Sequence, residues 1–496
     1  MAQVLPFLVG GQWRSASSTF ESIYPADGTV SAVVAEAGDS DVDDAVRSAK
    51  QTLASASWRD MPTHRRARLL QRFADLIERD CESLADAQTR DNGKPIAESR
   101  GQVAGAAEFF RYYAAVCEVS QGEVVPSRGP YFAFCDYEPI GVVAAIAPWN
   151  SPLTLEAQKI APALAAGNTV VLKSSEVTPR VGLEYGRIAL EAGFPTGALN
   201  VVTGKGNVGQ TLVNHPDVNM VTFTGGTRTG RAIGRITGAR TIPAILELGG
   251  KSPNIVFDDA NLDAAVAGAM LAIFHNAGQS CNAGSRIFVQ ESVYEAFVAR
   301  LVDATRNLVV GDPYNAATAL GPVSSFHHRE QIEQMVASAS AEGAAILTGG
   351  RRPRGAAFER GAYLEPTLLA VDNGMRIARE EIFGPVGCVI PFRDDVHLLE
   401  LANDNDFGLA CGIWTIDHAR ALRIGRGINT GVVWINTYKV TAVNMPFGGN
   451  KASGVGREGG WPGMRAYMAE KSYYVGTSAT SVGWPPQTIR TPVNVK

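Results

Sequence analysis

From residue 142 onward, short apolar segments alternate with segments of helical periodicity, and few architectures accommodate that order. With helices expected near Leu153–Leu164 and Gly182–Ala192, the predicted strands of this series are Val142–Ala147, Thr169–Lys173, Leu199–Val202, Met220–Phe223 and Ile242–Glu247. Such alternation is typical of βαβ units built around a parallel sheet. We therefore predict an α/β fold that binds ligands at the carboxyl ends of its strands.

The same alternation begins again beyond Pro253. A predicted helix at Leu262–Phe274 is followed by predicted strands at Arg286–Gln290 and near Cys388–Phe392, Cys411–Thr415 and Val432–Ile435. A chain of 496 residues also exceeds the usual size of one domain. We expect a second α/β lobe.

The segments outside these two series predict helices and a small arm. Asp41–Ser55 places its apolar residues on one helical face, with Ser40 as the expected cap, and a second helix should begin near Pro62. Glu123–Tyr137 is rich in Val, Tyr and Phe and broken by Pro and Gly, which indicates a hairpin. Tyr467–Val475 is expected to form a strand before an extended tail.

Composition excludes several classes of protein. The formal net charge of −4 indicates no nucleic-acid surface, and no run of roughly 18 apolar residues predicts a membrane span. The amino-terminal segment resembles neither a secretory signal nor a transit peptide, so a cytoplasmic location is expected. The six cysteines are widely spread, which argues against a disulfide framework or a metal site. All except Cys281 are expected to be buried small hydrophobes.

Cys281 lies between glycines in Gly278-Gln-Ser-Cys-Asn-Ala-Gly284. A thiol in a glycine-rich turn can be approached closely by a small electrophile. Glu247, in Glu-Leu-Gly-Gly-Lys-Ser-Pro, and Asn150, in Pro-Trp-Asn-Ser-Pro, add a carboxylate and a carboxamide in distinctive settings. Covalent oxidation of an aldehyde requires these three groups.

Two glycine-rich turns follow predicted strands. Gly204-Lys-Gly-Asn-Val-Gly209 fits the pattern of a dinucleotide fingerprint but lacks an acidic residue about twenty positions later. Phe223-Thr-Gly-Gly-Thr-Arg-Thr-Gly230 is the better candidate, because its backbone amides could approach a pyrophosphate. Lys173 and Glu176 could contact a ribose, or they could form a solvated pair on a loop. A carboxylate there would repel a 2′-phosphate, which favours NAD over NADP.

The chain resembles the aldehyde dehydrogenase superfamily over essentially its whole length. The matching segments, in the order usual for that family, are Pro148-Trp149-Asn150, Lys173-x-x-Glu176, Phe223-Thr-Gly-x-Thr227, Glu247-Leu-Gly-Gly-Lys251, Gly278-Gln-x-Cys281, Glu380-Glu-Ile-Phe-Gly-Pro385, Asn436 and Pro446-Phe-Gly-Gly449.

The resemblance implies an aldehyde dehydrogenase-like fold of two α/β lobes and a small β oligomerisation arm. It implies a nucleotide-binding domain formed by residues 1–120 and 139–248 and a catalytic domain over residues 249–448. Residues 121–138 and 465–496 would form the arm and the C-terminal tail. Members of the family are homodimers or homotetramers.

The resemblance also implies roles for individual residues. Cys281 corresponds to the nucleophile, Glu247 to the general base and Asn150 to the oxyanion donor, with Lys159 and Glu458 on a proton path. The implied cofactor contacts are Ile146, Pro148, Trp149, Lys173, Glu176, Gly206, Phe223, Gly225, Gly226, Gly230, Leu248, Glu381 and Phe383. No metal site is implied.

The expected reaction is oxidation of an aldehyde to a carboxylate with NAD, through a thiohemiacetal and a thioester on Cys281. An acylating enzyme that passes the thioester to coenzyme A is one alternative, although it would not need the water-activating Glu247. A non-enzymatic structural or binding protein on the same fold is another, but it would have no reason to keep all three groups.

The expected substrate is a small polar aldehyde, such as a semialdehyde acid. Positions near the tunnel that this family lines with aromatic side chains hold more polar residues here, which costs desolvation unless the ligand satisfies them. The residues expected to line the substrate are Ser151, Gln158, His275, Lys439, Thr441 and Phe447. Alternatively, Gln158 and Lys439 point to solvent, and His275 is a packed core residue.

Overall fold

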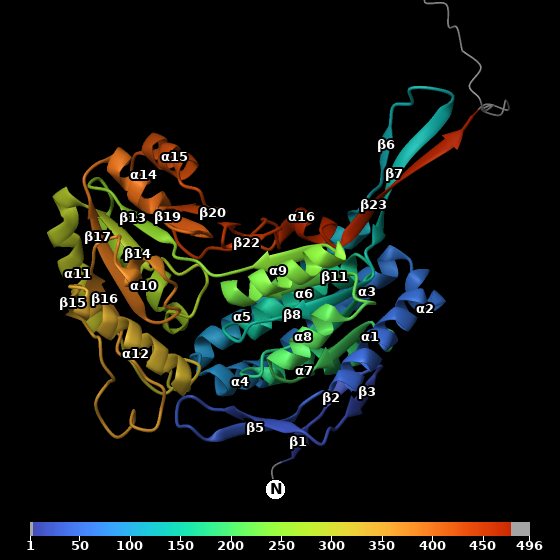
Figure 1. Ribbon diagram of the computed structural model, residues 1–496, viewed down its shortest axis with the longest axis horizontal. Coiled ribbons are helices and arrows are strands. Elements are labelled where there is room, and N and C mark those ends of the chain that lie inside the picture. Colours follow the sequence, from blue (N-terminus) through green and yellow to red (C-terminus); the bar gives the residue numbers. More distant parts are fainter. Residues whose placement is uncertain (1–2, 478–496) are drawn as a thin grey trace, which may run out of the picture.

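A computed structural model describes residues 3–477. The chain forms two α/β lobes side by side, and a narrow β arm projects from one of them (Figure 1). The first lobe contains an eight-stranded sheet with the strand order β22-β12-β11-β8-β9-β10-β2-β3. Its adjacent strands β12 (Ala244–Glu247), β11 (Met220–Thr224), β8 (Val142–Ile146), β9 (Thr169–Lys173) and β10 (Leu199–Val202) are all parallel. The flanking strands β22 (Gly454–Val455), β2 (Phe7–Val9) and β3 (Gln12–Arg14) are antiparallel to their neighbours.

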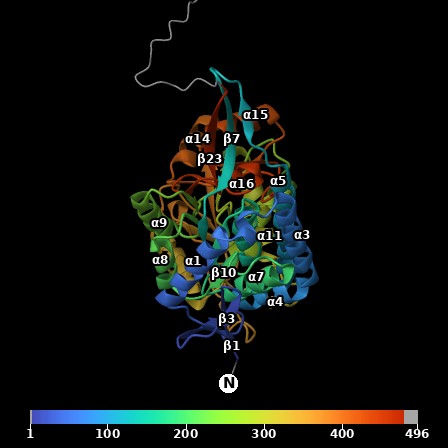
Figure 2. The same cartoon turned by 90° about the vertical axis from the view of Figure 1, so that its right-hand side faces the viewer.

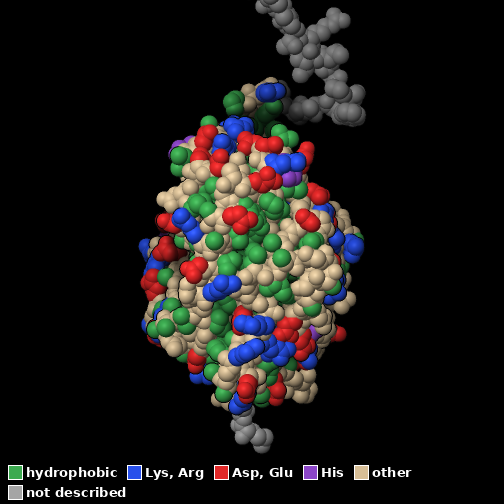
Figure 3. Space-filling view, turned by 90° about the vertical axis from the view of Figure 1, so that its left-hand side faces the viewer, with side chains coloured by type: hydrophobic (Ala, Val, Ile, Leu, Met, Phe, Trp, Pro, Cys, Tyr) green, Lys and Arg blue, Asp and Glu red, His purple; other side chains and the backbone are tan. Residues whose placement is uncertain are grey.

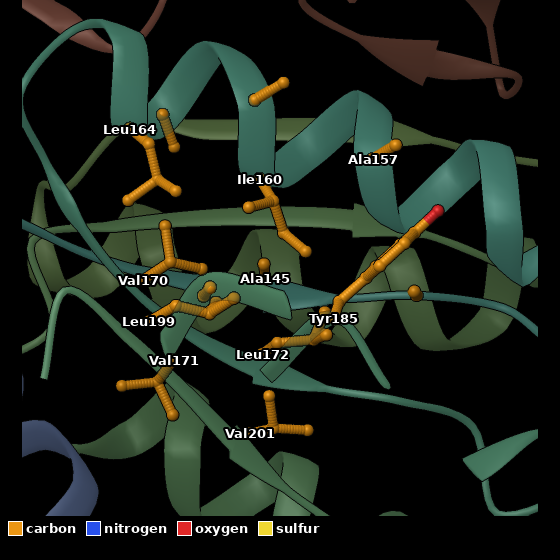
Figure 4. Close-up of a cluster of buried hydrophobic side chains, with 14 of the residues drawn as sticks. Ala145, Ala157, Ile160, Leu164, Val170, Val171, Leu172, Tyr185, Leu199 and Val201 are labelled. Carbon is orange, nitrogen blue, oxygen red and sulfur yellow. The ribbon is translucent and has the colours of Figure 1, made fainter. Parts of the chain in front are cut away.

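Helices cover both faces of this sheet, so its inner strands are buried throughout (Figure 2). Strands buried on both faces are continuous apolar runs rather than alternating ones. In Figure 4, Ala157, Ile160 and Leu164 of α6 (Pro152–Ala165) pack toward Val170 of β9 and Ala145 of β8. The helices that pack on the sheet are α1 (Asp39–Ala54), α6, α7 (Pro179–Ala192), α8 (Gly206–Asn214) and α9 (Thr227–Arg240). Outside them, α3 (Thr63–Arg79), α4 (Cys81–Asn92) and α5 (Ile96–Val119) pack against α6 and α7 and against one another.

The second lobe contains a seven-stranded sheet with the order β15-β16-β17-β14-β13-β19-β20. All of its neighbouring strands are parallel except β15, which pairs antiparallel with β16. Its strands are β13 (Pro253–Val256), β14 (Arg286–Gln290), β15 (Ala345–Thr348), β16 (Thr367–Ala370), β17 (Val386–Phe392), β19 (Ala410–Trp414) and β20 (Val432–Ile435). Its helices are α10 (Leu262–Phe274), α11 (Tyr294–Arg306), α12 (Phe326–Ala341), α13 (Arg376–Arg379), α14 (Asp395–Asn403) and α15 (His418–Gly427).

The predicted hairpin is present as the core of the arm. β7 (Tyr131–Pro139) pairs antiparallel with β6 (Glu123–Val125) on one side and with β23 (Met468–Gly476) on the other. Phe134 and Tyr473 stack across β7 and β23 at 4.6 Å between ring centroids. The part of the predicted tail at 478–496 lies outside the described residues.

Smaller elements complete the fold. A three-stranded sheet has the order β1-β5-β4 and a two-stranded sheet pairs β18 with β21. The remaining elements are β1 (Val4–Leu5), β4 (Thr19–Ile23), β5 (Val30–Ala35), β18 (Phe407–Gly408), β21 (Asn450–Lys451), α2 (Ala56–Arg59), α16 (Gly460–Arg465) and the 3₁₀ helices η1 (His275–Gly278) and η2 (Glu291–Val293).

Each lobe has its own hydrophobic core. One core runs from Phe7 to Leu248 and includes Met464 and Tyr467, and the other runs from Ile255 to Tyr438. The chain therefore crosses between the lobes just after β12 and returns before β22. The predicted domain boundaries, including which lobe binds nucleotide, stay a prediction.

Two local predictions are wrong. α1 begins at Asp39 rather than Asp41, so Ser40 lies inside its first turn, and the Asp41 carboxylate accepts a hydrogen bond from the Gly38 backbone N–H at 2.9 Å. Cys81 and Cys135 are only partly buried, whereas Cys117, Cys388 and Cys411 are buried as expected. Cys135 is partly exposed because the arm has no thick core around it.

Across the described residues, every helix is too short or too polar to cross a membrane. On the face of the molecule shown in Figure 3, acidic and basic side chains are interspersed with apolar ones.

Candidate active site

A cavity of about 230 Å³ lies where the ends of β8, β11 and β12 meet the second lobe. It brings together Cys281, Glu247 and Asn150, as the sequence motifs predict. The whole lining comprises Pro148, Trp149, Asn150, Thr224, Gly225, Gly226, Glu247, Leu248, Gly249, Cys281, Glu381 and Phe383.

The glycines that follow β12 allow the two lobes to approach each other at this cavity. A Cβ at Gly250 would lie 2.4 Å from the Cys281 carbonyl oxygen, and one at Gly249 would lie 2.1 Å from a carboxylate oxygen of Glu381. The Gly250 N–H also donates to Glu381 Oε1 at 3.1 Å. The glycines thus bring the base-bearing strand end directly against the nucleophile loop.

Asn150 is fixed to the nucleophile loop by hydrogen bonds. Its Nδ2 donates to the Gln279 carbonyl oxygen at 3.0 Å, and Asn276 Nδ2 donates to the carbonyl oxygens of Asn150 at 3.0 Å and Gln279 at 2.9 Å. Asn276 adopts a positive φ of 56°, a conformation that asparagine tolerates better than most residues. A carboxamide carries two N–H donors, so Asn150 keeps one for a ligand.

Glu247 is a buried carboxyl group, 4% exposed, and neither of its oxygens has a hydrogen-bond partner within the described residues. Burial raises its pKa well above the ordinary value, and the nearby charge of Glu458 adds to this effect while Lys159 opposes it. A buried polar group without a partner is costly and often marks a functional site. Glu247 can accept a proton from a small molecule in the cavity.

The predicted relay residues form a buried ion pair beside the cavity. Lys159 Nζ lies 2.6 Å from Glu458 Oε1, and the two side chains are 0% and 2% exposed. Lys159 Nζ also donates to Thr224 Oγ1 at 2.7 Å, and Thr224 lines the cavity. The pair therefore reaches the cavity through Thr224.

Breaking this ion pair should destabilise the fold strongly. Glu458→Leu leaves Lys159 buried without its partner, which we expect to lower the free energy of unfolding by about 3–5 kcal/mol. The double variant Lys159→Met/Glu458→Leu should recover most of that loss, because it removes both charges. Denaturant titrations measure both values.

The exposed pair Lys471–Glu138, with side chains 53% and 44% exposed, supplies the control. Glu138→Ala should lower the free energy of unfolding by at most about 1 kcal/mol. If Glu458→Leu and Glu138→Ala lowered the free energy of unfolding by equally small amounts, the buried pair would not be an ion pair that the fold depends on.

Burial raises the pKa of the Cys281 thiol to about 12, and the charges of Glu381 and Glu247 push the pKa in the same direction. The Asn282 backbone N–H and Lys439 act in the opposite direction. The thiol of the protein alone is therefore protonated near neutral pH. A reactive thiolate needs an additional positive charge or a base.

The predicted cofactor contacts follow the carboxyl edge of the first sheet. Ile146 ends β8, Lys173 ends β9, Phe223 lies in β11, and Leu248 follows β12. Lys173 Nζ donates to Glu176 Oε2 at 3.0 Å, with Lys173 buried and Glu176 43% exposed.

Two of the predicted glycines lie in helices rather than in turns. Gly230 is inside α9, where a Cβ would lie 2.2 Å from Leu248 Cδ2, so it allows helix packing instead of forming the turn at Gly225 and Gly226. Gly206 is the first residue of α8, and a Cβ there would have open space around it.

Aromatic side chains from both lobes meet next to the cavity. The Trp149 and Phe383 rings are 5.2 Å apart and perpendicular, and His328 lies 5.5 Å from Trp149. Phe383 has a φ of 57°, and its carbonyl oxygen is 2.6 Å from His328 Nε2. These contacts hold Phe383 in a strained backbone conformation facing Trp149.

A second polar cluster lies beside the nucleophile loop and involves predicted substrate-lining residues. Ser151 Oγ lies 2.9 Å from Lys94 Nζ, and His275 Nε2 lies 3.4 Å from Glu98 Oε2. His275 is 36% exposed, so it is not a core histidine.

The other predicted lining residues differ in exposure. Lys439 Nζ is buried, so the lysine does not point to solvent. Gln158 is buried in α6, Phe447 is half-buried and Thr441 is exposed.

A model of the aldehyde dehydrogenase family matches residues 13–473. The chain belongs to this family. It is 42% identical over 465 residues to betaine aldehyde dehydrogenase 1 of Rhizobium meliloti (strain 1021), covering 93% of this chain and 95% of that relative. It is 41% identical over 474 residues to human retinal dehydrogenase 2, covering 94% and 91% of the two chains.

Solved structures agree with this assignment. The NAD⁺ complex of an aldehyde dehydrogenase from Bacillus cereus has a TM-score of 0.94 and 39% identity, covering 96% of this chain and 97% of that one. The NAD⁺ complex of betaine aldehyde dehydrogenase from Staphylococcus aureus has a TM-score of 0.95 and 36% identity, covering 97% of both chains. The predicted fold class and the predicted class of enzyme, an aldehyde-oxidising oxidoreductase, are confirmed.

Several residues of this aldehyde dehydrogenase site were not predicted from its sequence. Thr224, Asn276 and His328 contact predicted site residues, and Lys94 and Glu98 lie next to the predicted lining. The sequence could have indicated the backbone conformation of Asn276, because an asparagine between an apolar helix and a glycine-rich turn often adopts a positive φ. Thr224 lies in the Phe223-Thr-Gly-x-Thr227 motif, but nothing in that motif indicates its contact with Lys159. His328, Lys94 and Glu98 have no signal in the sequence, because the site residues that they contact lie on distant elements.

Proposed function

We propose that this aldehyde dehydrogenase oxidises a small polar aldehyde to a carboxylate with NAD⁺, through an acyl thioester on Cys281. The observation that carries the proposal is the cavity shared by a thiol, a fixed carboxamide and an unpartnered carboxyl group. Each of the three groups can perform one step of the reaction. All three line the cavity at the carboxyl edge of the parallel strands of the first sheet.

In the first half-reaction, the Cys281 sulfur adds to the aldehyde carbon and the carbonyl oxygen becomes an oxyanion. The remaining Asn150 N–H and the Cys281 backbone N–H are the proposed donors to that oxygen. NAD⁺ held beside Trp149, Glu381 and Phe383 would supply the acceptor for the hydride on the former aldehyde carbon, whose loss converts the adduct on Cys281 into a thioester. This step needs the thiol in its ionised form.

In the second half-reaction, Glu247 removes a proton from a water that attacks the thioester carbon. The C–S bond breaks, the carboxylate leaves and Cys281 recovers its thiol. Burial raises the pKa of Glu247, which makes its carboxylate a stronger base than an ordinary one. Thr224, Lys159 and Glu458 are the proposed path for that proton.

The residues at the sheet edge fit a dinucleotide. Glycines at 225 and 226 precede α9, where backbone N–H groups suit a pyrophosphate, and Glu381 and Phe383 reach the cavity from the second lobe. The NAD⁺ complexes of the Bacillus cereus and Staphylococcus aureus proteins support this cofactor. The half-exposed Glu176 carboxylate disfavours the 2′-phosphate of NADP.

The test is the absorbance of reduced cofactor with a panel of aldehydes, with NAD⁺ or NADP⁺, and with or without coenzyme A. We expect turnover with NAD⁺ that does not depend on coenzyme A. Turnover only with coenzyme A would establish the acylating alternative, and no signal with any aldehyde would favour a non-enzymatic protein.

The oxyanion role of Asn150 gives a separate prediction. Asn150→Ala should lower kcat by about 10²- to 10³-fold, the usual loss for one such donor, with a smaller change in KM. Asn276→Ser is the matched comparison, because it loosens the carboxamide without removing it and should cost less. A larger loss for Asn276→Ser than for Asn150→Ala would contradict the assignment.

The assembly, the location and the domain roles also belong to the proposal. We propose a homodimer or homotetramer that uses the arm of β6, β7 and β23, whose Val124, Phe132 and Tyr474 are exposed. The cytoplasmic location and the assignment of the first lobe to nucleotide and the second to catalysis stay predictions.

A further inference from the structure

Lys439 is a buried cation without a partner, and neither half-reaction described above uses it. Its Nζ atom is shielded from solvent and has no hydrogen-bond partner among the described residues. Its backbone has a φ of 57°, which is rare for a lysine. A buried ammonium group that no hydrogen bond satisfies is costly. The buried Nζ at this strained backbone position therefore indicates a site for a ligand.

The loop that carries Lys439 is attached to the nucleophile loop. The neighbouring Tyr438 is buried, and its hydroxyl donates to the Asn282 carbonyl oxygen at 3.1 Å. The Trp434 indole N–H donates to the Val440 carbonyl oxygen at 2.8 Å, which closes the turn around Lys439. The positive charge of Lys439 is close enough to Cys281 to oppose the rise in the pKa of the thiol.

Lys94 has hydrogen-bond partners, whereas one oxygen of Glu98 has none among the described residues. Lys94 Nζ donates to Gln102 Oε1 at 2.9 Å and to Ser151 Oγ at 2.9 Å. Glu98 Oε1 accepts from the Asn276 backbone N–H at 3.4 Å, and its other oxygen lies 3.4 Å from His275 Nε2.

The cluster contains two lysines, one carboxyl group and one imidazole. Burial and the charges of Lys439 and Lys94 lower the pKa of His275 to about 3, so its imidazole is neutral. Burial also lowers the pKa of Lys94 to about 7 and that of Lys439 to about 8, and the charge of Glu98 opposes both changes. Near neutral pH, Lys439 is therefore the more fully charged of the two lysines, and it is the one without a hydrogen-bond partner among the described residues. The cluster also reaches solvent through His275, whose side chain is 36% exposed.

We infer that the substrate is an aldehyde that carries a carboxylate, and that Lys439 binds that carboxylate through its ammonium group. The inference rests on the proposed function, because it supposes that the aldehyde end lies at Cys281. A carboxylate would give Lys439 the charge-assisted hydrogen bond that it lacks. Lys439 is then a substrate-binding residue that sets specificity.

The same charges disfavour a cationic aldehyde. The R. meliloti and S. aureus relatives are named betaine aldehyde dehydrogenases, and betaine aldehyde carries a quaternary ammonium group. In this chain such a group would meet Lys439 and Lys94 at low dielectric, where like charges repel strongly. The substrate class should therefore differ from that of these relatives.

The experiment compares kcat/KM of the full-length enzyme with NAD⁺ for matched aldehydes. One series carries a terminal carboxylate at increasing chain length, the second carries a methyl group in its place, and the third carries a trimethylammonium group. For the best chain length we expect the acid to exceed its neutral counterpart by about 10- to 100-fold, the range of one hydrogen bond to a charged group. The cation should be the poorest substrate.

Variants of Lys439 test whether its ammonium group causes the preference for the acid over the neutral aldehyde. Lys439→Met should reduce kcat/KM for the acid at least tenfold more than for the neutral aldehyde, and Lys439→Arg should restore part of the difference. Lys50→Met, at an exposed lysine paired with Asp217, should leave the preference for the acid unchanged. Equal losses for acid and neutral aldehyde in Lys439→Met would reduce Lys439 to a structural role and overturn the inference.

A binding measurement separates this inference from the proposed reaction. Cys281→Ser in the full-length protein, titrated calorimetrically with succinate and with its neutral diamide, succinamide, should bind succinate at least tenfold more tightly, and Lys439→Met should remove the difference. A succinate preference without any aldehyde oxidation would refute the proposed function alone. Oxidation of neutral aldehydes with no succinate preference would refute the inference alone.

Discussion

Cys281→Ala should abolish aldehyde oxidation, with kcat falling on the order of 10⁵- to 10⁶-fold, the range seen when a covalent nucleophile is removed. The reason is that sulfur is the strongest nucleophile among the polar groups of the cavity, whose other polar side chains include an amide, a hydroxyl and carboxyl groups. The fold should survive, because Cys281 is only partly buried and the substitution leaves a small void. Initial rates with NAD⁺ and a good aldehyde measure the loss.

Cys135→Ala is the matched control, because Cys135 is also partly buried but lies in the arm. It should retain essentially full activity at equal protein concentration. If Cys281→Ala kept even a tenth of the wild-type rate, the covalent mechanism would be refuted.

Glu247→Gln should separate the two half-reactions. Gln has nearly the same shape but cannot take a proton, so hydrolysis of the thioester should slow by about 10²- to 10⁴-fold, while formation of reduced cofactor should persist. Stopped-flow absorbance should show a rapid burst of reduced cofactor, about one equivalent per site, followed by a slow steady rate.

Glu156→Gln supplies a sharp comparison for this effect. Glu156 is also fully buried, has no hydrogen-bond partner within the described residues, and has a pKa raised to about 8 by burial, but it does not line the cavity. It should show no burst and no comparable loss. A burst in Glu156→Gln, or its absence in Glu247→Gln, would contradict the role of Glu247.

Much of the fold could be predicted because the sheet strands have strong local signals. The fully buried runs Val142–Ile146 and Thr169–Lys173 are continuous apolar segments, and their order dictates a parallel sheet. The same topology explains why Glu247 and the glycines at 225 and 226 line one cavity, since parallel strands end at one edge. Short or exposed strands such as Ala345–Thr348 lack this pattern and were missed.

The wrong prediction of a cap at Ser40 reflects a competing local interaction. Ser40 has a side chain suited to a helix cap, but Asp41 reaches back to the Gly38 backbone and the helix starts earlier. The packing of Gly230 against Leu248 inside α9 is a second local interaction, and the predicted cofactor contact of Gly230 stays a prediction. Neither interaction can be inferred from the spacing of the residues alone.

The polar cluster at Lys439 could not be assembled from sequence patterns. Lys94 and Glu98 lie at the junction of α4 and α5, whereas Lys439 follows β20 at the far end of the second lobe. Their charged groups lie close together only where the two lobes are in contact. The sequence indicated a polar lining, and the structure adds that one ammonium group in it has no partner.

The most direct test of covalent catalysis is mass spectrometry of Glu247→Gln, quenched with acid during the burst and then digested. We expect the peptide containing Cys281 to gain the mass of the substrate acyl group, and we expect no such adduct in Glu247→Gln/Cys281→Ser. An unmodified Cys281 peptide during an observed burst, or the acyl group on any other residue, would contradict covalent catalysis by Cys281.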